Sequence, residues 1–195
     1  MSALLSELLR VREPMNNVEN WPSVTQVLSP WTAQGFANIP PALLERASDR
    51  GTAVHDICGR IALGEFVVGI PTELQGYVTS FEKWLTTQVE NVILAETRLY
   101  DNGLMFHGKE DLIVTLVDGR IALVDLKTPL ALQKSWAVQL AAYNRLAHIN
   151  GYDVGPYGSL RLDPAGGIPK MKWYEEGPAP FNAFLSALNV WRYMN

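Results

Sequence analysis

The sequence feature that most constrains the fold is a change of hydrophobic period near residue 92. Upstream, apolar residues recur at helical spacing. From 92 to 127 the chain is rich in β-branched and aromatic residues and is broken by Asp101-Asn102-Gly103 and Asp118-Gly119. Short Gly-containing breaks join antiparallel strands, because parallel strands need a long crossover. We therefore predict three antiparallel strands over 92–100, 104–117 and 120–127.

Helical spacing predicts helices on both sides of these strands. Ser23 is a typical N-cap for a short helix that Pro30 would end, and Pro40-Pro41 would open the next helix. Further helices are expected over 52–62, 72–90, 132–149 and 181–194, and two short strands over 157–162 and 170–175. This order predicts a mixed α/β (α+β) fold with a central mixed sheet of about five strands flanked by helices.

Composition and length narrow the class further. The 195 residues are 48% hydrophobic and 18% charged, which is typical of one globular domain and excludes a disordered chain. We expect an N-terminal helical lead-in and linker over 1–20 and a single domain over 21–195. The only cysteine, Cys58, excludes an internal disulfide and a four-thiolate iron–sulfur cluster, and we assign it to the core.

Charge and hydropathy bear on partners and location. No run reaches the ~18 apolar residues of a membrane span, and Glu7 and Arg10 stand where a signal peptide would be apolar. These features favour a cytoplasmic protein without a membrane partner. The formal net charge of -4 means that any contact with nucleic acid must be local.

The strongest chemical signal is Asp125-Leu126-Lys127 at the end of the third predicted strand. Side chains two apart on a strand share a face, so Asp125 and Lys127 project together. Asp111, on the preceding strand, is a second carboxylate that the hairpin could bring beside Asp125. Alone, the pair at a strand end is also typical of ordinary solvated charges.

The register of the hairpin decides whether the two acids meet. A two-residue turn pairing Val117 with Arg120 would place Asp111 opposite Leu126, on the wrong face. A three-residue loop with Gly119 in the left-handed region would instead place Asp111 opposite Asp125, with Cβ atoms about 5 Å apart. Two carboxylates at this separation repel, so the functional interpretation needs a divalent cation with Lys127 beside it. Oxygen-rich sites of this kind suit Mg²⁺ or Mn²⁺ and phosphoryl chemistry.

Four segments together resemble one family. They are Arg50-Gly51-Thr52-Ala53-Val54-His55, Gly108-Lys109-Glu110-Asp111, Asp125-Leu126-Lys127 and Gln139-Leu140-Ala141-Ala142-Tyr143. In this order they resemble the RecB-like branch of the PD-(D/E)XK nuclease superfamily. With Trp21-Pro22-Ser23-Val24-Thr25, the chain is similar to the phage-type exonuclease branch and, more distantly, to the mitochondrial genome maintenance exonuclease. The resemblance spans 21–149 and implies a restriction-endonuclease-like core.

The resemblance also implies roles for individual residues. His55, Asp111, Asp125 and the Leu126 carbonyl would bind Mg²⁺, with Mn²⁺ as a substitute, and Lys127 would orient the attacking water. Gln139 and Tyr143, at i and i+4 on one helix face, would contact the DNA. Further candidates for DNA contact are Arg50, Thr128 and Lys134, and Glu96 is a candidate partner for Lys127 behind the metal ligands.

Several of these residues could instead have a purely structural role. Glu96 could pair with Arg98 at the surface, and Gln139 and Tyr143 could be packing residues at the core edge. His107 and His148 have no motif context, so we assign them no role in the site.

The expected function is therefore a Mg²⁺-dependent exonuclease that degrades DNA from a free end in recombination, repair or phage DNA processing. A structure-selective endonuclease of the same fold and a non-catalytic protein that binds nucleic-acid ends remain alternatives. No GxxxxGK[ST] phosphate loop is present, so a recombination or helicase partner is expected to supply any motor. The host would be a bacterium or a phage-infected cell.

Overall fold

The computed structural model describes residues 18–34, 39–129, 133–175 and 177–195, so most of the expected lead-in over 1–20 lies outside it. The helical elements are η1 (Val18–Asn20), α2 (Val24–Gln34), α3 (Pro41–Ala62), α4 (Thr72–Gln88), α5 (Ser135–Ile149) and α6 (Pro178–Met194). The strands are β1 (Val89–Asp101), β2 (Phe106–Leu116), β3 (Ile121–Lys127), β4 (Tyr157–Arg161) and β5 (Lys170–Tyr174).

The five strands form one sheet in the order β1-β2-β3-β4-β5. Only β3 and β4 pair in parallel, and α5 makes the crossover between them. The other neighbours are antiparallel. The sheet confirms the predicted mixed α/β architecture of about five strands flanked by helices.

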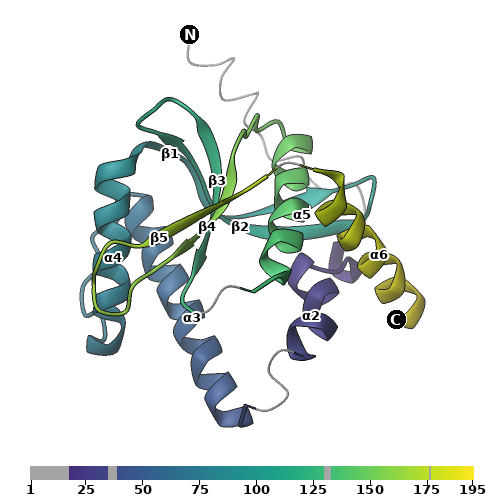
Figure 1. Cartoon of the computed structure of the whole chain (residues 1–195), viewed down its shortest axis with the longest axis horizontal. Coiled ribbons are helices and arrows are strands. Elements are labelled where there is room, and N and C mark those ends of the chain that lie inside the picture. The colour runs from purple at the N-terminus through teal and green to yellow at the C-terminus, as the bar shows by residue number, and fades with distance from the viewer. Residues whose placement is uncertain (1–17, 35–38, 130–132, 176) are drawn as a thin grey trace.

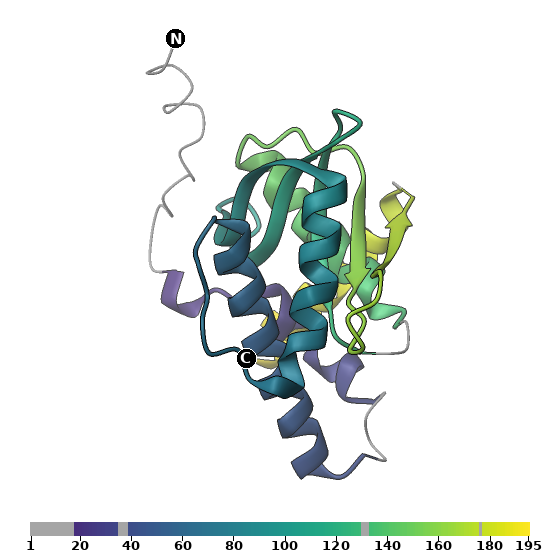
Figure 2. The same cartoon turned by 90° about the vertical axis from the view of Figure 1, so that its left-hand side faces the viewer.

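Helices cover both faces of the sheet, and each face has its own core (Figures 1 and 2). On one face α2, α5 and α6 bury residues such as Val27, Leu140 and Phe184 against Ile113 and Leu123. On the other face α3 and α4 pack against strand residues such as Val114 and Val124, and Cys58 lies in this second core as predicted. No helix in the described part of the chain combines the length and the apolar character needed to cross a membrane.

The β2–β3 hairpin has the register that the functional interpretation requires. Leu112 pairs with Val124 and Thr115 with Ile121. The Leu116 N–H donates to the Arg120 carbonyl at 2.8 Å, and Gly119 has a φ of 83°. The three-residue loop is therefore confirmed, and the two-residue alternative is wrong.

Two boundary predictions are wrong. Pro30 does not end α2, which continues to Gln34. A proline has no N–H to donate to the carbonyl four residues earlier, here that of Gln26, and the Ser29 hydroxyl donates to this carbonyl at 2.9 Å instead. The two helices expected on either side of Gly51 are one helix, α3, because helical packing on both sides outweighs the low propensity of a single glycine.

Candidate metal centre and active site

The sequence motifs converge on one open pocket of about 720 Å³. It lies where the start of α2, the middle of α3 and the start of α5 approach strands β1, β2 and β3. Its polar lining includes His55, Glu96, Arg98, Lys109, Asp111, Asp125, Lys127, Gln139 and Tyr143. Six elements, α2, α3, α5, β1, β2 and β3, therefore contribute polar side chains to a single concave surface.

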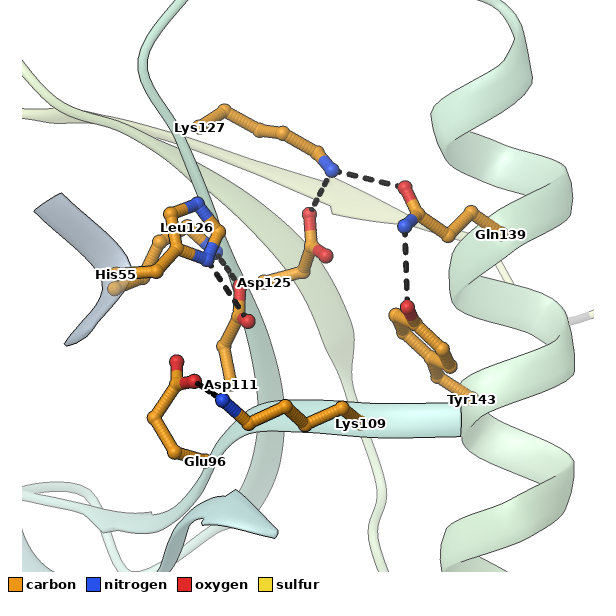
Figure 3. A network of polar contacts seen from close by, with 9 residues as sticks. All are labelled: His55, Glu96, Lys109, Asp111, Asp125, Leu126, Lys127, Gln139 and Tyr143. Atoms are coloured by element: carbon orange, nitrogen blue, oxygen red, sulfur yellow. Dashed lines mark hydrogen bonds and ion pairs between the residues drawn. The ribbon is translucent and has the colours of Figure 1, made fainter. Parts of the chain in front are cut away.

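Asp111 is fixed from two directions (Figure 3). One carboxylate oxygen lies 3.0 Å from Nδ1 of His55 on α3, and the other accepts the backbone N–H of Leu126 on β3 at 2.7 Å. Burial raises the pKa of Asp111, but His55, Lys127 and the Leu126 N–H outweigh burial and lower it overall. Asp111 therefore stays a carboxylate in a buried position.

The same contact changes the titration of His55. Burial lowers the pKa of His55, but the adjacent Asp111 and the more distant Asp125 outweigh burial, so the pKa lies above its ordinary value. Metal binding through a ring nitrogen requires the neutral imidazole. A proton and a metal ion would therefore compete for His55.

A second set of contacts links Asp125 to α5. The ammonium group of Lys127 lies 2.6 Å from Asp125 and donates to Oε1 of Gln139 at 2.8 Å, and Nε2 of Gln139 donates to the Tyr143 hydroxyl at 3.2 Å. Lys127 also lies over the Trp136 ring. Burial raises the pKa of Asp125, Lys127 offsets part of this and Asp111 adds to it, giving about 6. Lys127 is therefore held by the Asp125 carboxylate, the Gln139 side-chain amide and the Trp136 ring.

Glu96 joins the cluster through an unusual backbone conformation. Its φ of 49° lies in the left-handed region, which non-glycine residues seldom adopt. Strict alternation would put Ala95 and Leu99 on one face of β1, yet they lie in opposite cores, so the alternation is broken between them. The flanking pairs Ala95–Leu112 and Thr97–Glu110 place Glu96 across from Asp111.

The ligand atoms of His55, Glu96 and Asp111 all lie within 4.8 Å of one another. One imidazole and two carboxylates could hold a divalent ion, and the carboxylate oxygens are the donors that Mg²⁺ and Mn²⁺ prefer. Asp125 lies outside this triad because its carboxylate faces Lys127. Glu96 itself forms an ion pair with Lys109 rather than with Lys127 or Arg98.

Three of the candidate DNA contacts lie apart from the pocket lining. Arg50 stacks over the ring of Tyr77 on α4, and its Nε is buried. Thr128 is buried near Gly51, and Lys134 is an exposed residue at the start of α5. The geometry brings His55, Asp111, Asp125, Lys127, Gln139 and Tyr143 together, but not these three.

Sequence reasoning overlooked Glu110. It is fully buried, and within the described part of the chain neither carboxylate oxygen has a hydrogen-bond partner. Burial, and then the charges of Asp111 and Asp125, raise its pKa well above the ordinary value. Neighbouring side chains on a strand point to opposite faces, so the sequence predicted that Glu110 would face away from Asp111 and from the site. For this reason nothing in the sequence singled out Glu110.

The chain was also compared with known proteins. No family model matches it, and no curated protein matches it significantly.

Proposed function

We propose that the chain is a metal-dependent deoxyribonuclease of the RecB-like PD-(D/E)XK type. The observation that carries the proposal is the convergence of His55 on α3, Asp111 on β2 and the Asp125–Lys127 pair on β3 in one pocket. These are the motif residues of the resemblance, and they come from elements separated by up to about 70 positions in sequence.

The donor set fits Mg²⁺, with Mn²⁺ as a substitute. His55, Glu96 and Asp111 would hold the ion, and by resemblance Asp125 and the Leu126 carbonyl would complete its shell. A bound divalent ion lowers the pKa of a coordinated water and neutralises charge on the scissile phosphate. The buried carboxylates are consistent with this, since an opposite charge would relieve their mutual repulsion.

Lys127 would act on the attacking water and on the transition state. Its ammonium group is paired with Asp125 and held by Gln139, so it presents a fixed positive charge at the pocket wall. A fixed charge stabilises the negative charge that develops on the phosphate oxygens without having to reorganise. Gln139 and Tyr143 orient Lys127 and line the path of the substrate backbone.

The remaining lining favours a nucleic-acid substrate. Trp21 offers an aromatic surface, and Arg98 and Lys109 add two cations to the same pocket. Aromatic rings stack on bases while cations follow phosphates, which is a common mode of gripping single strands. By resemblance the enzyme is an exonuclease that acts on a free DNA end in recombination, repair or phage DNA processing. It would act together with a helicase or recombination partner in the cytoplasm.

The test uses end-labelled linear DNA and covalently closed circular DNA with Mg²⁺, Mn²⁺ or EDTA. We expect metal-dependent loss of linear DNA, no cutting of closed circles and no cleavage by Asp125→Ala despite retained DNA binding. Asp118→Ala, at the exposed far end of the same hairpin, is the matched control and should cleave normally. Cutting of closed circles would assign an endonuclease. Binding without cleavage under any metal would assign the non-catalytic alternative.

A further inference from the structure

Glu96 has two competing uses in this site. Its carboxylate is one of the three groups that converge as metal ligands, and it also forms an ion pair with Lys109. Lys109 pairs with Oε2 of Glu96, whereas Oε1 is buried and has no hydrogen-bond partner among the described residues. We propose that Lys109 is an internal counter-ion that competes with the divalent metal for the charge of Glu96, so that Glu96 binds the metal more tightly once Lys109 leaves it. This inference rests on the metal site of the proposed function and adds the control of its occupancy.

The two partners differ in their freedom to move. The Glu96 side chain is 17% exposed and passes so close to Gly59 on α3 that an added Cβ there would collide with its Cγ. The Lys109 side chain is 54% exposed. Its neighbour in register is Arg98, so it reaches Glu96 diagonally across the β1–β2 ladder. The stem of Glu96 is therefore confined by α3, and Lys109, whose pairing with Glu96 is drawn in Figure 3, is the more exposed partner and the one with room to move away.

The charges of the site make Lys109 and the metal mutually unfavourable. Glu96 pairs with Lys109 and Asp125 with Lys127, while Asp111 contacts His55, so these three carboxylates and two ammonium groups together carry one net negative charge when His55 is neutral. A divalent ion beside Glu96 would lie within a few Å of the Lys109 ammonium, where like charges repel strongly at the reduced dielectric of a protein surface.

Lys127, unlike Lys109, cannot move away from a bound divalent ion. Its side chain is only 12% exposed, and it is held by Asp125, Gln139 and the Trp136 ring. Lys109 is the ammonium group that can leave. A phosphodiester entering the pocket would offer Lys109 another anion, so substrate and metal would each favour the binding of the other.

The test is a Mn²⁺ titration without DNA, followed by electron paramagnetic resonance and calorimetry. We expect Lys109→Met to bind Mn²⁺ about tenfold more tightly than the natural chain, a difference of about 1.4 kcal/mol. Arg98→Met removes the cation across the ladder from Lys109 but leaves both members of the Glu96–Lys109 pair in place, and it should change the affinity much less. Glu96→Gln should weaken binding, and in that background Lys109→Met should give no further gain.

Each outcome decides between the two proposals. An unchanged affinity in Lys109→Met, an equal gain in Arg98→Met, or a gain that persists with Glu96→Gln would overturn the competition. Absence of Mn²⁺ binding by the natural chain would instead overturn the metal site of the proposed function. Lys109→Gln serves as a second variant should Lys109→Met fold poorly, and Lys109→Arg, which keeps the charge, should retain the natural affinity.

Discussion

At the scale of single residues, neighbouring carboxylates behave differently because their partners differ. Asp111 accepts from His55 and from a backbone N–H, and its pKa is lowered. Asp125 is also buried and pairs with Lys127, and burial together with the charge of Asp111 raises its pKa to about 6 despite that pairing. The two acids of one hairpin thus divide into a group whose pKa is lowered and a group that titrates near pH 6.

We predict that Mn²⁺ affinity falls as the pH is lowered through the pKa of His55. This pKa is raised, so protons begin to compete with the metal above pH 6.5, the ordinary value for histidine. The His55→Gln variant should bind more weakly and should lose much of the pH dependence, keeping the part that Asp125 contributes. Dissociation constants measured between about pH 5.5 and about pH 8 test this. A pH profile unchanged by His55→Gln would contradict it.

Gly108 gives a prediction about packing. A Cβ at this position would lie 2.6 Å from Cε1 of Tyr143 and 2.8 Å from Cδ1 of Leu146, so α5 would have to move away from β2. We expect Gly108→Ala to destabilise the protein by about 1–3 kcal/mol in urea unfolding, as overpacking does.

The matched control is Gly51→Ala in the interior of α3. There the added Cβ meets only Thr128 Oγ1, at 3.7 Å. Removing a helical glycine should leave stability unchanged or raise it by up to about 1 kcal/mol. Equal losses in both variants would show that the contact with α5 is not the cause.

At the scale of elements, local signals predicted much of the fold. The sequence located the hairpin and offered the register that brings Asp111 toward Asp125 beside one that would have kept them apart, and the folded hairpin, with Gly119 in the left-handed region, selects the first. The left-handed conformation of Glu96 could not be predicted at all, because no propensity of glutamate favours it. Its position follows from tertiary contacts with α3 and Lys109, which only the assembled sheet provides.

Pro30 is a second case in which tertiary contacts override a local sequence signal, here the expected end of a helix, and it gives a test. The helix tolerates Pro30 because the Ser29 hydroxyl satisfies the Gln26 carbonyl and because Val27 and Leu28 are buried against the sheet. Pro30→Ala would restore the backbone hydrogen bond, and we expect thermal unfolding to show a gain of about 1–3 kcal/mol.

Pro41→Ala is the control for this prediction. Pro41 occupies the first turn of α3, where a proline costs no helical hydrogen bond. Its replacement should leave stability nearly unchanged. A destabilised Pro30→Ala variant would mean that the proline is itself required for α2 to pack.

At the scale of the whole molecule, an acidic chain with a net charge of -4 carries a local group of cations in its pocket. Long-range attraction to DNA would therefore be weak, and the proposed binding would depend on the few cations in the pocket that can reach phosphates. Arg98, Lys109 and Lys127 are the lysine and arginine residues in the lining of this pocket, within the described part of the chain.

The salt dependence of single-strand binding tests this view. Each phosphate contact contributes a slope of about −0.7 in the logarithm of affinity against the logarithm of salt concentration, so three cations predict about −2. In fluorescence anisotropy with EDTA, Arg98→Ala should reduce the slope by about 0.7. Arg120→Ala removes the same charge at the far end of the β2–β3 hairpin, where Arg120 pairs with Asp118, and should leave the slope unchanged. If both variants lowered the slope equally, the whole surface rather than the pocket would be contacting the strand, and binding would be unrelated to the site that holds Asp111 and Asp125.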